Sequence, residues 1–262
     1  MAGLAEGSWT ALVLAAGRGP DDPVARAYSV SHKCLVEIAG KPMLARVVEV
    51  LNAHPAIGDI LISIDDRSVA EQALGILQKD VTIMPSRESA AASAAAGLEA
   101  AAPDQPVLLT TADHPLLDCA MLDRFLEGSL ASRADITVGL TRAETILAAY
   151  PSARRTFLRF GPDSVSGCNL YGLMTPRAAT AIEFWKRVEQ DRKRPWRLIA
   201  AFGIGPLLRY LTGRVDLEAA FVIGSRRLGI EAKPVIIPFA EAAIDVDKPA
   251  DKELCDAILG RR

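Results

Sequence analysis

The sequence contains few of the residues that build disulfide frameworks and metal clusters. Its four cysteines lie far apart without forming a C-x-x-C pair, and only three histidines are present. These counts argue against a disulfide scaffold, a structural zinc site and a histidine-rich metal centre. They predict a reduced protein of the cytoplasm.

An excess of positive charge and long apolar runs are also lacking. The formal net charge is −2 and the pI is about 6.0, whereas proteins that bind nucleic acid by neutralising phosphates usually carry a basic excess. The N-terminal MAGLAEGSWT has no basic region followed by an apolar core, as a signal peptide would. The nearby apolar run ALVLAAG is far too short to span a bilayer. We therefore expect no nucleic-acid partner and no integral membrane segment.

What is present is an ordinary globular composition, with 50% hydrophobic and 24% charged residues in a chain of 262. A chain of this length can bury a sizeable core. No internal repeat or low-complexity linker divides it. We predict a single domain over residues 1–262, within which residues 151–228 form a smaller acceptor-side or lid subregion.

Short apolar runs alternate with helix-like segments over the first 140 residues. The pattern predicts strands at 10–15, 59–64, 81–84, 106–111 and 134–140, with helices at 42–53, 69–77, 86–102 and 119–128. Beyond residue 140 the pattern is weaker, with strands expected at 156–160, 169–174 and 233–238 and helices at 176–185 and 249–259. This alternation predicts an α/β fold with a doubly wound, mostly parallel sheet. Ligands of such sheets bind outside the carboxyl ends of the strands.

A glycine-containing loop follows the first predicted strand directly. Glycine lets a backbone approach a ligand closely, and successive backbone N–H groups can hold an anion such as a triphosphate. The loop is neither a Walker A motif nor a dinucleotide fingerprint, because it has no G-K-[ST] ending and an aspartate where the third glycine would fall. Its candidate nucleotide-binding residues are Leu14, Ala15, Ala16, Gly17, Arg18 and Gly19.

Two lysines lie on the long segment after this loop. Lys33 can reach back to the α- and β-phosphates as a mobile point charge. Lys41 belongs to a Gly-Lys-Pro turn that launches the next helix, and we expect it to be structural or peripheral.

Candidate metal ligands end two other segments. Asp113 lies at the carboxyl end of the strand in LTTADHPLL, where the alternative role is a helix cap. Asp245 and Asp247 lie two residues apart in AIDVDKPAD, so an extended chain places both on one face. Magnesium prefers one or two carboxylates together with substrate phosphates and water, which this set can provide.

These four motifs together resemble the nucleotidyltransferase family of the molybdenum cofactor guanylyl- and cytidylyltransferases and the sugar-phosphate nucleotidyltransferases. The resemblance rests on LAAGRG, on Lys33 with the following AGKPML, on TADHPLL and on DVDKPAD, and covers roughly residues 10–140 and 231–258. It implies a Rossmann-like nucleotidyltransferase fold. It further implies a reaction in which a nucleoside monophosphate moves from an NTP to a small phosphorylated acceptor, with Mg²⁺ and release of pyrophosphate.

The resemblance also assigns roles to matching positions. Residues 14–19 would wrap the base and phosphates, Lys33 would neutralise the triphosphate, and Asp113 and Asp247 would hold Mg²⁺. The alanine-rich segment 89–98 is similar to the family's serine-rich helix start facing the nucleoside. Ser93 is the best match there and Ser89 the second.

In this family an arginine usually follows the second glycine of the loop, and this sequence departs from that pattern. Here Pro20, Asp21 and Asp22 follow, and the loop to Lys33 is longer. Arg26 is our candidate for the catalytic arginine, with Arg18 as the second choice. An acidic pair would be unfavourable beside a triphosphate unless it points away.

The 151–228 segment carries weaker signals. Asn169 occupies a position similar to one that meets the acceptor in related enzymes, although an ordinary polar turn would explain it too. The charged run 186–197 could bind an anionic acceptor or form a solvated helix face. Trp185, Trp196 and the apolar run 198–211 could belong to the core, to a lid or to a lipid-facing surface.

Two other functions remain open from the sequence. One is a metal-dependent nucleotide-sugar glycosyltransferase, which usually has an Asp-x-Asp on a central strand; here the only Asp-x-Asp lies near the C-terminus. The other is a non-catalytic nucleotide-binding protein. No residue type identifies the base, the acceptor or the oligomeric state.

Overall fold

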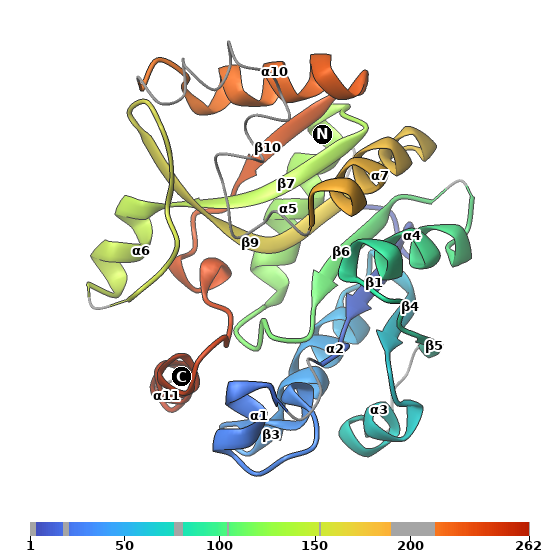
Figure 1. The fold of residues 1–262 in the computed structure, drawn as a ribbon, viewed down its shortest axis with the longest axis vertical. Helices are drawn as coiled ribbons and strands as arrows, with labels where there is room; N and C mark the ends of the chain where they lie inside the picture. The colour runs from blue at the N-terminus through green and yellow to red at the C-terminus, as the bar shows by residue number, and fades with distance from the viewer. Residues whose placement is uncertain are drawn as a thin grey trace.

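The computed structural model describes residues 4–17, 21–75, 81–103, 105–151, 153–189 and 213–261. Within these residues the centre is an eight-stranded sheet of order β10-β7-β9-β6-β1-β4-β5, with β8 paired to β9 outside this path (Figure 1). Its strands are β1 (Trp9–Leu14), β4 (Ile57–Ile64), β5 (Val81–Pro85), β6 (Val107–Thr111), β7 (Ile136–Arg142), β8 (Leu158–Phe160), β9 (Asp163–Leu173) and β10 (Ala232–Ile236).

The sheet is mostly parallel, as predicted. β1 pairs in parallel with β4 and β6, β4 with β5, and β10 with β7. The exception is β9, which lies antiparallel between β6 and β7. It begins at Asp163, earlier than the predicted strand at 169–174, because the serines and the aspartate of its first half obscure the apolar pattern. The α/β prediction is confirmed, and one antiparallel strand is inserted beside the central strand β6.

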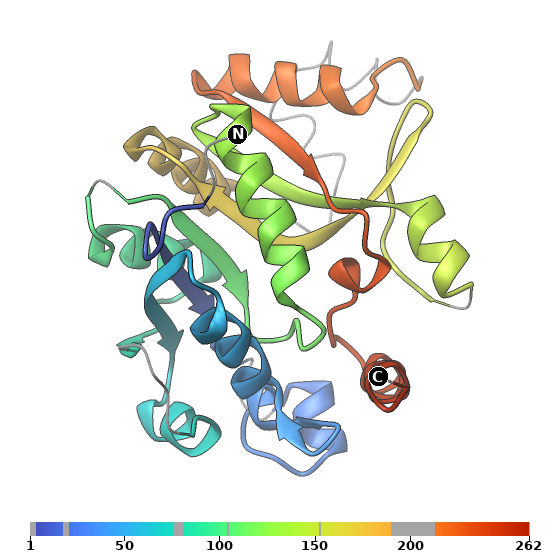
Figure 2. The ribbon, with the colours of Figure 1, turned by 180° about the vertical axis from the view of Figure 1, so that it is seen from behind.

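Helices cover both faces of the sheet. In Figure 1, α4 (Ala90–Ala100) and α7 (Ala179–Val188) lie in front of it; Figure 2 shows α2 (Met43–Ala53) and α5 (Cys119–Ser132) on the other face. α4 approaches β1 so closely that a Cβ at Gly97 would lie 2.3 Å from a methyl carbon of Leu12. The alanine-rich sequence of α4 permits this approach, since small side chains leave room for the strand.

The apolar stripe predicted on the second helix is buried against the sheet. Its members Met43, Leu44, Val47, Val48 and Leu51 are all buried on α2. On the same face, α5 contributes a fully buried phenyl ring to the same core. Burial of these stripes holds α2 and α5 to the sheet and so positions the loops at its carboxyl edge.

The segment between β1 and α2 contains several short elements, namely α1 (Pro23–Ala27), η2 (Lys33–Leu35), β2 (Glu37–Ile38) and β3 (Lys41–Pro42). β2 and β3 form a hairpin whose turn residues Ala39 and Gly40 have φ of 47° and 75°. Glycine suits such a turn, because the left-handed region costs it little. Lys41 pairs with Glu49 of α2 at 2.6 Å on the surface, a position that agrees with the expected structural or peripheral role.

The other helices are α3 (Arg67–Ala73), α6 (Ala143–Ala149), η3 (Pro176–Ala178), α10 (Leu217–Leu228), η5 (Ala240–Ala243) and α11 (Pro249–Leu259). Two predicted helices have shifted bounds because a polar side chain caps them. Asp66 caps α3 by accepting from the N–H of Ser68, and Ser89 caps α4 by accepting from the N–H of Ala92.

The described parts of the 151–228 subregion form β8, β9, η3, α7 and α10. Its role as an acceptor-side lid stays a prediction. Trp196, the run 198–211 and most of the charged run 186–197 lie outside the described residues. Across the described ranges, no helix combines the length and the apolar character needed to cross a membrane.

The buried ring of Phe125 gives a test of this packing. Phe125→Ala should destabilise the protein by about 3–5 kcal/mol, because it leaves a cavity under the sheet. On the same helix Leu130 is 43% exposed, so Leu130→Ala should cost less than about 1 kcal/mol. Urea unfolding of both variants measures the difference. Equal losses of stability would contradict this placement of α5.

Candidate active site

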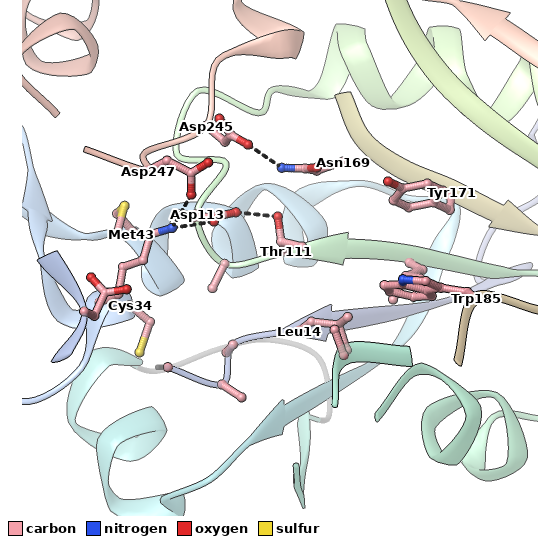
Figure 3. A pocket seen from close by; sticks show the side chains of 18 residues that line it. Leu14, Cys34, Met43, Thr111, Asp113, Asn169, Tyr171, Trp185, Asp245 and Asp247 are labelled. Carbon is pink, nitrogen blue, oxygen red and sulfur yellow. Dashed lines mark hydrogen bonds and ion pairs between the residues drawn. The ribbon is translucent and has the colours of Figure 1, made fainter. Parts of the chain in front are cut away.

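A cavity of about 350 Å³ opens at the carboxyl ends of β1 and β6. Most of the sequence-predicted site segments meet there (Figure 3). The predicted residues that line the cavity are Leu14, Ala15, Ala16, Gly17, Lys33, Asp113, Asn169 and Asp247. The parallel strands explain this meeting, since their carboxyl ends share one edge of the sheet.

The ammonium group of Lys33 joins the two carboxylates that the sequence singled out. Its Nζ donates to Oδ2 of Asp113 at 2.6 Å and to Oδ1 of Asp247 at 3.2 Å. Lys33 begins η2, and the two following residues, Cys34 and Leu35, are buried and anchor this turn. The lysine is thereby presented to the cavity from a segment that is 80 residues from Asp113 and 214 from Asp247 in the chain.

The charges of this trio are set by burial and by each other. Burial is the largest influence on the pKa of Asp113 and would raise it, but Lys33 and the hydroxyl of Thr111 hold it below its usual value. Thr111 Oγ1 donates to Asp113 Oδ1 at 2.6 Å. Burial likewise opposes the charge of Lys33, yet the two carboxylates leave its pKa raised. Lys33 and Asp113 are therefore both ionised near neutral pH.

Backbone contacts hold the C-terminal carboxylate segment beside Asp113. The N–H of Val246 donates to the carbonyl oxygen of Asp113 at 2.9 Å. Asp251, at the start of α11, accepts from the N–H groups of Asp247 and Lys248 at 3.0 and 2.9 Å. These bonds fix the backbone at residue 247, although its side chain is 54% exposed. The carboxylate is thus placed by its backbone and faces the open part of the cavity.

A second polar network lies next to the first one. Asn169 donates from Nδ2 to Oδ2 of Asp245 at 3.1 Å, and Arg155 pairs with the other carboxylate oxygen of Asp245. Arg155 Nη1 also donates to the backbone carbonyl of Asp245 at 3.2 Å. Burial is the largest influence on Asp245 and leaves its pKa raised in spite of Arg155. Asp245 and Asp247 both line the cavity, as the two-residue spacing predicted.

The donor set around Lys33 fits a hard divalent cation. Asp113 and Asp247 both reach the same nitrogen atom, so both can reach one cation. The described residues contain no group of three or more His, Cys, Asp or Glu side chains able to hold a metal. A cation bound by these two carboxylates would complete its shell with phosphate oxygens and water, which is the preference of Mg²⁺.

A family model described as the MobA-like NTP transferase domain matches residues 11–193. The matched range is well over half of the chain. The chain belongs to the MobA-like NTP transferase family. It is a nucleotidyltransferase, and family membership sets aside the glycosyltransferase and non-catalytic alternatives.

Curated relatives of this NTP transferase include 2-C-methyl-D-erythritol 4-phosphate cytidylyltransferases. The protein from Xanthomonas campestris pv. campestris is 31% identical over 258 residues, covering 94% of this chain and 82% of the relative. That from Streptomyces avermitilis is 27% identical and covers 98% of this chain and 94% of the relative.

Solved structures show the same fold. A hypothetical transferase from Thermus thermophilus has a TM-score of 0.78 at 28% identity, covering 93% of this chain and 98% of that one. A CMP:2-keto-3-deoxy-manno-octonic acid synthetase in complex with CTP has a TM-score of 0.60 at 15% identity and covers 97% of this chain and 99% of that one. At that identity the likeness concerns the fold alone.

Three predicted residues of the NTP transferase do not line this cavity. Ser93 is buried in α4, where its hydroxyl accepts from the N–H of Arg87 at 2.9 Å. Ser89 is the cap of α4, and its neighbour Ala90 lines the cavity instead. Arg26 is exposed on α1. Backbone partners hold both serines and the short helix turns Arg26 outward. The nucleotide-binding and catalytic roles of these three residues stay predictions. Arg18 and Gly19 lie outside the described residues.

Sequence reasoning missed several lining residues. Asp22 is buried at the cavity, but its Oδ1 accepts from the N–H groups of Val24 and Ala25, which explains how an acid can lie near this loop. Tyr171 and Trp185 line the far end of the cavity. A weak signal existed for Asp22, since an aspartate followed by proline is a frequent helix start. No sequence signal distinguished Arg155, which pairs with Asp245, from its neighbour Arg154.

Replacing Lys33, whose ammonium group is shared by two carboxylates, should reveal how much the burial of the Asp113 carboxylate lowers the stability of the protein. In the wild type, the lowered pKa of Asp113 contributes stability above its unfolded-state pKa, and this is lost as pH falls through the folded value. In Lys33→Met, burial without the ammonium group raises that pKa, so the penalty is largest near pH 7 and shrinks as pH falls. We expect a loss of about 2–3 kcal/mol at pH 7.

Urea unfolding of the wild type, Lys33→Met and the double variant Lys33→Met/Asp113→Asn at pH 5 and pH 7 measures this effect. The double variant should recover part of the lost stability, because no unpaired carboxylate remains at position 113. A pH-independent loss in Lys33→Met, with no recovery in the double variant, would show that Lys33 does not hold Asp113 ionised.

Proposed function

We propose that this nucleotidyltransferase moves a nucleoside monophosphate from an NTP to a small phosphorylated acceptor and releases pyrophosphate, in a reaction that depends on Mg²⁺. The observation that carries the proposal is the convergence of Lys33, Asp113 and Asp247 beside the loop Leu14 to Gly17. A cation and two carboxylates next to a glycine-containing loop suit a substrate made of phosphates.

The chain's own residues position and neutralise the triphosphate. The loop after β1 offers backbone N–H groups, and Lys33 places its charge where the phosphates lie. Asp113, which accepts a hydrogen bond from Thr111, orients this lysine toward the cavity before the substrate binds.

Asp113 and Asp247 would hold the metal ion. When bound, Mg²⁺ supplies charge neutralisation for the phosphates and for the departing pyrophosphate.

The reaction is an in-line attack of an acceptor phosphate oxygen on the α-phosphorus of the NTP. A new P–O bond forms, and the bond to the bridging oxygen breaks, so that pyrophosphate leaves with the electron pair. A phosphate monoester has a second pKa of about 6 and is already ionised near neutral pH, so no general base is required. This agrees with the state of His114, whose burial lowers its pKa to about 4 and which does not line the cavity.

The named curated relatives are cytidylyltransferases, which makes CTP the first nucleotide to test. Pyrophosphate release should be measured with CTP, GTP, UTP and ATP against a panel of phosphorylated polyols and sugars, with Mg²⁺ and with EDTA. Activity is expected with one nucleotide–acceptor pair and only with the metal. Unchanged turnover in EDTA, or no pyrophosphate with any pair, would overturn the proposal.

The carboxylate at position 113 provides the sharpest single test. Asp113→Asn should lower kcat by at least about a hundredfold, because the amide can neither neutralise a metal ion nor hold Lys33 as strongly. Circular dichroism and urea unfolding should show that the fold persists. Asp59→Asn is the matched control, since Asp59 is exposed on β4 far along the strand from the cavity. Near wild-type kcat in Asp113→Asn would exclude this residue from the metal and phosphate chemistry.

A further inference from the structure

Lys33 occupies the space between the two candidate metal ligands. Its Nζ lies 2.6 Å from Oδ2 of Asp113 and 3.2 Å from Oδ1 of Asp247. The other oxygen of Asp113 accepts from the hydroxyl of Thr111 at 2.6 Å, so Oδ2 is the one that faces the ammonium group. Figure 3 shows the carboxylates of Asp113 and Asp247 near one another in this part of the cavity. The pair therefore already holds one cation, which belongs to the protein itself.

A magnesium ion and this ammonium group compete for the same position. Mg²⁺ binds carboxylate oxygens at about 2.1 Å, which is closer than the nitrogen lies to either oxygen. An ion bound by Oδ2 of Asp113 and Oδ1 of Asp247 would thus enter the space in which Nζ lies. Two positive charges at such a separation repel each other strongly. Lys33 has to leave the carboxylates when a metal ion binds to both of them.

The described residues of the cavity leave no unpaired carboxylate for a displaced Lys33. Two further acidic residues line the cavity, and both have partners: Asp22 accepts from two backbone N–H groups, and Asp245 pairs with Arg155. The Lys33 side chain is only 15% exposed, and an ammonium group that loses its counter-charges at such a site is strongly destabilised. Displacement of Lys33 is therefore favourable only when a new anion enters together with the metal ion. A triphosphate is such an anion.

The two carboxylates are held in place by bonds that do not involve Lys33. The backbone carbonyl of Asp113 accepts from the N–H of Val246 at 2.9 Å, and the N–H of Asp247 donates to the carboxylate of Asp251 at 3.0 Å. A neutral side chain at position 33 should therefore leave a preformed pair of carboxylates without a cation. Such a pair is a better site for a divalent ion than the wild-type pair is.

Building on the proposed function, we infer that Lys33 occupies the metal position in the free enzyme and leaves it only when a metal ion arrives together with a triphosphate. The ammonium group then moves from the carboxylates to the phosphates and frees Asp113 and Asp247 for the ion. The free enzyme consequently binds a divalent ion weakly. Binding of the metal and binding of the nucleotide are coupled, and each raises the affinity for the other by the same factor.

Mn²⁺ binding in the absence of nucleotide tests this exchange. Free Mn²⁺ is measured by electron paramagnetic resonance in titrations of the wild type, Lys33→Met and Lys33→Gln at pH 7. Each neutral variant should bind Mn²⁺ roughly tenfold to a hundredfold more tightly than the wild type, because the ion no longer has to break two charged hydrogen bonds. Lys33→Arg keeps a cation between the carboxylates and should bind Mn²⁺ as weakly as the wild type does.

Two controls separate this effect from a general change of charge. Lys248 is exposed, follows Asp247 in the chain and does not line the cavity. Lys248→Met should therefore alter the Mn²⁺ affinity by less than about threefold. In Lys33→Met/Asp113→Asn the gain in affinity should disappear, because one of the two carboxylates is gone. Urea unfolding of each variant checks that the titrated protein is folded.

Equal Mn²⁺ affinity in the wild type and in both neutral variants would overturn the inference, as would an equal gain in Lys33→Arg or in Lys248→Met. The wild type alone also tests it. A micromolar Kd for Mn²⁺ without nucleotide would show that Lys33 does not compete with the ion.

The two proposals fail separately. If the neutral variants gain no affinity for Mn²⁺ while the wild type releases pyrophosphate with Mg²⁺, the exchange is wrong and the nucleotidyl transfer stands. If no nucleotide–acceptor pair yields pyrophosphate but the neutral variants bind Mn²⁺ more tightly, the proposed reaction is wrong and Lys33 still competes with the ion.

Discussion

The candidate site depends on one ammonium group shared by two carboxylates. Asp113 and Asp247 come from distant parts of the chain, and their like charges would oppose a close approach without a cation between them. Lys33 supplies that charge from a third segment, and the hydrogen bond between the backbones of Val246 and Asp113 fixes the approach. The folded chain therefore holds the geometry of a cation site, at the cost of partly burying three charged groups.

β9 lies between β6 and β7 and lines one side of the cavity. Strands β1, β4 and β5 lie on one side of β6, together with the loop after β1, and β9 lies on the other side. β6 lies at the border, and the residue that its strand delivers to the cavity is Asp113. Bond exchange at phosphorus needs both substrates in contact at one point. Asp113 directly follows β6, so it lies where the two sides of the cavity meet and the sheet does not have to move.

Much of this arrangement could be predicted from local patterns. Apolar runs identified β1, β4, β5 and β6, and parallel topology then brought the loop after β1 to the same edge as Asp113. The order of the strands could not be read in this way, because β9 carries Asp163 and Ser166 among its apolar positions and lies beside β6 only through long-range pairing. Aromatic lining residues were also hidden, since a half-buried tryptophan on an amphipathic helix has the same pattern as a core residue.

The two serines predicted to face the nucleoside share one physical feature. Ser89 and Ser93 lie near a helix start, where hydroxyl groups have backbone N–H partners within reach. The family resemblance predicted that they face the nucleoside. Both hydroxyl oxygens already accept a hydrogen bond from a backbone N–H group. Asp22 follows the same rule, as its carboxylate is held by two backbone N–H groups even though it lies at the cavity.

The second polar network beside the cavity does not include Lys33. Asn169 has a φ of 51°, a conformation that costs a non-glycine residue on the order of 1 kcal/mol. Its bond to Asp245, which Arg155 holds from the other side, offsets that cost. Asp245 and Asp247 are two residues apart, so a single extended segment joins this network to the Lys33 trio. A displacement of that segment would therefore move both networks together.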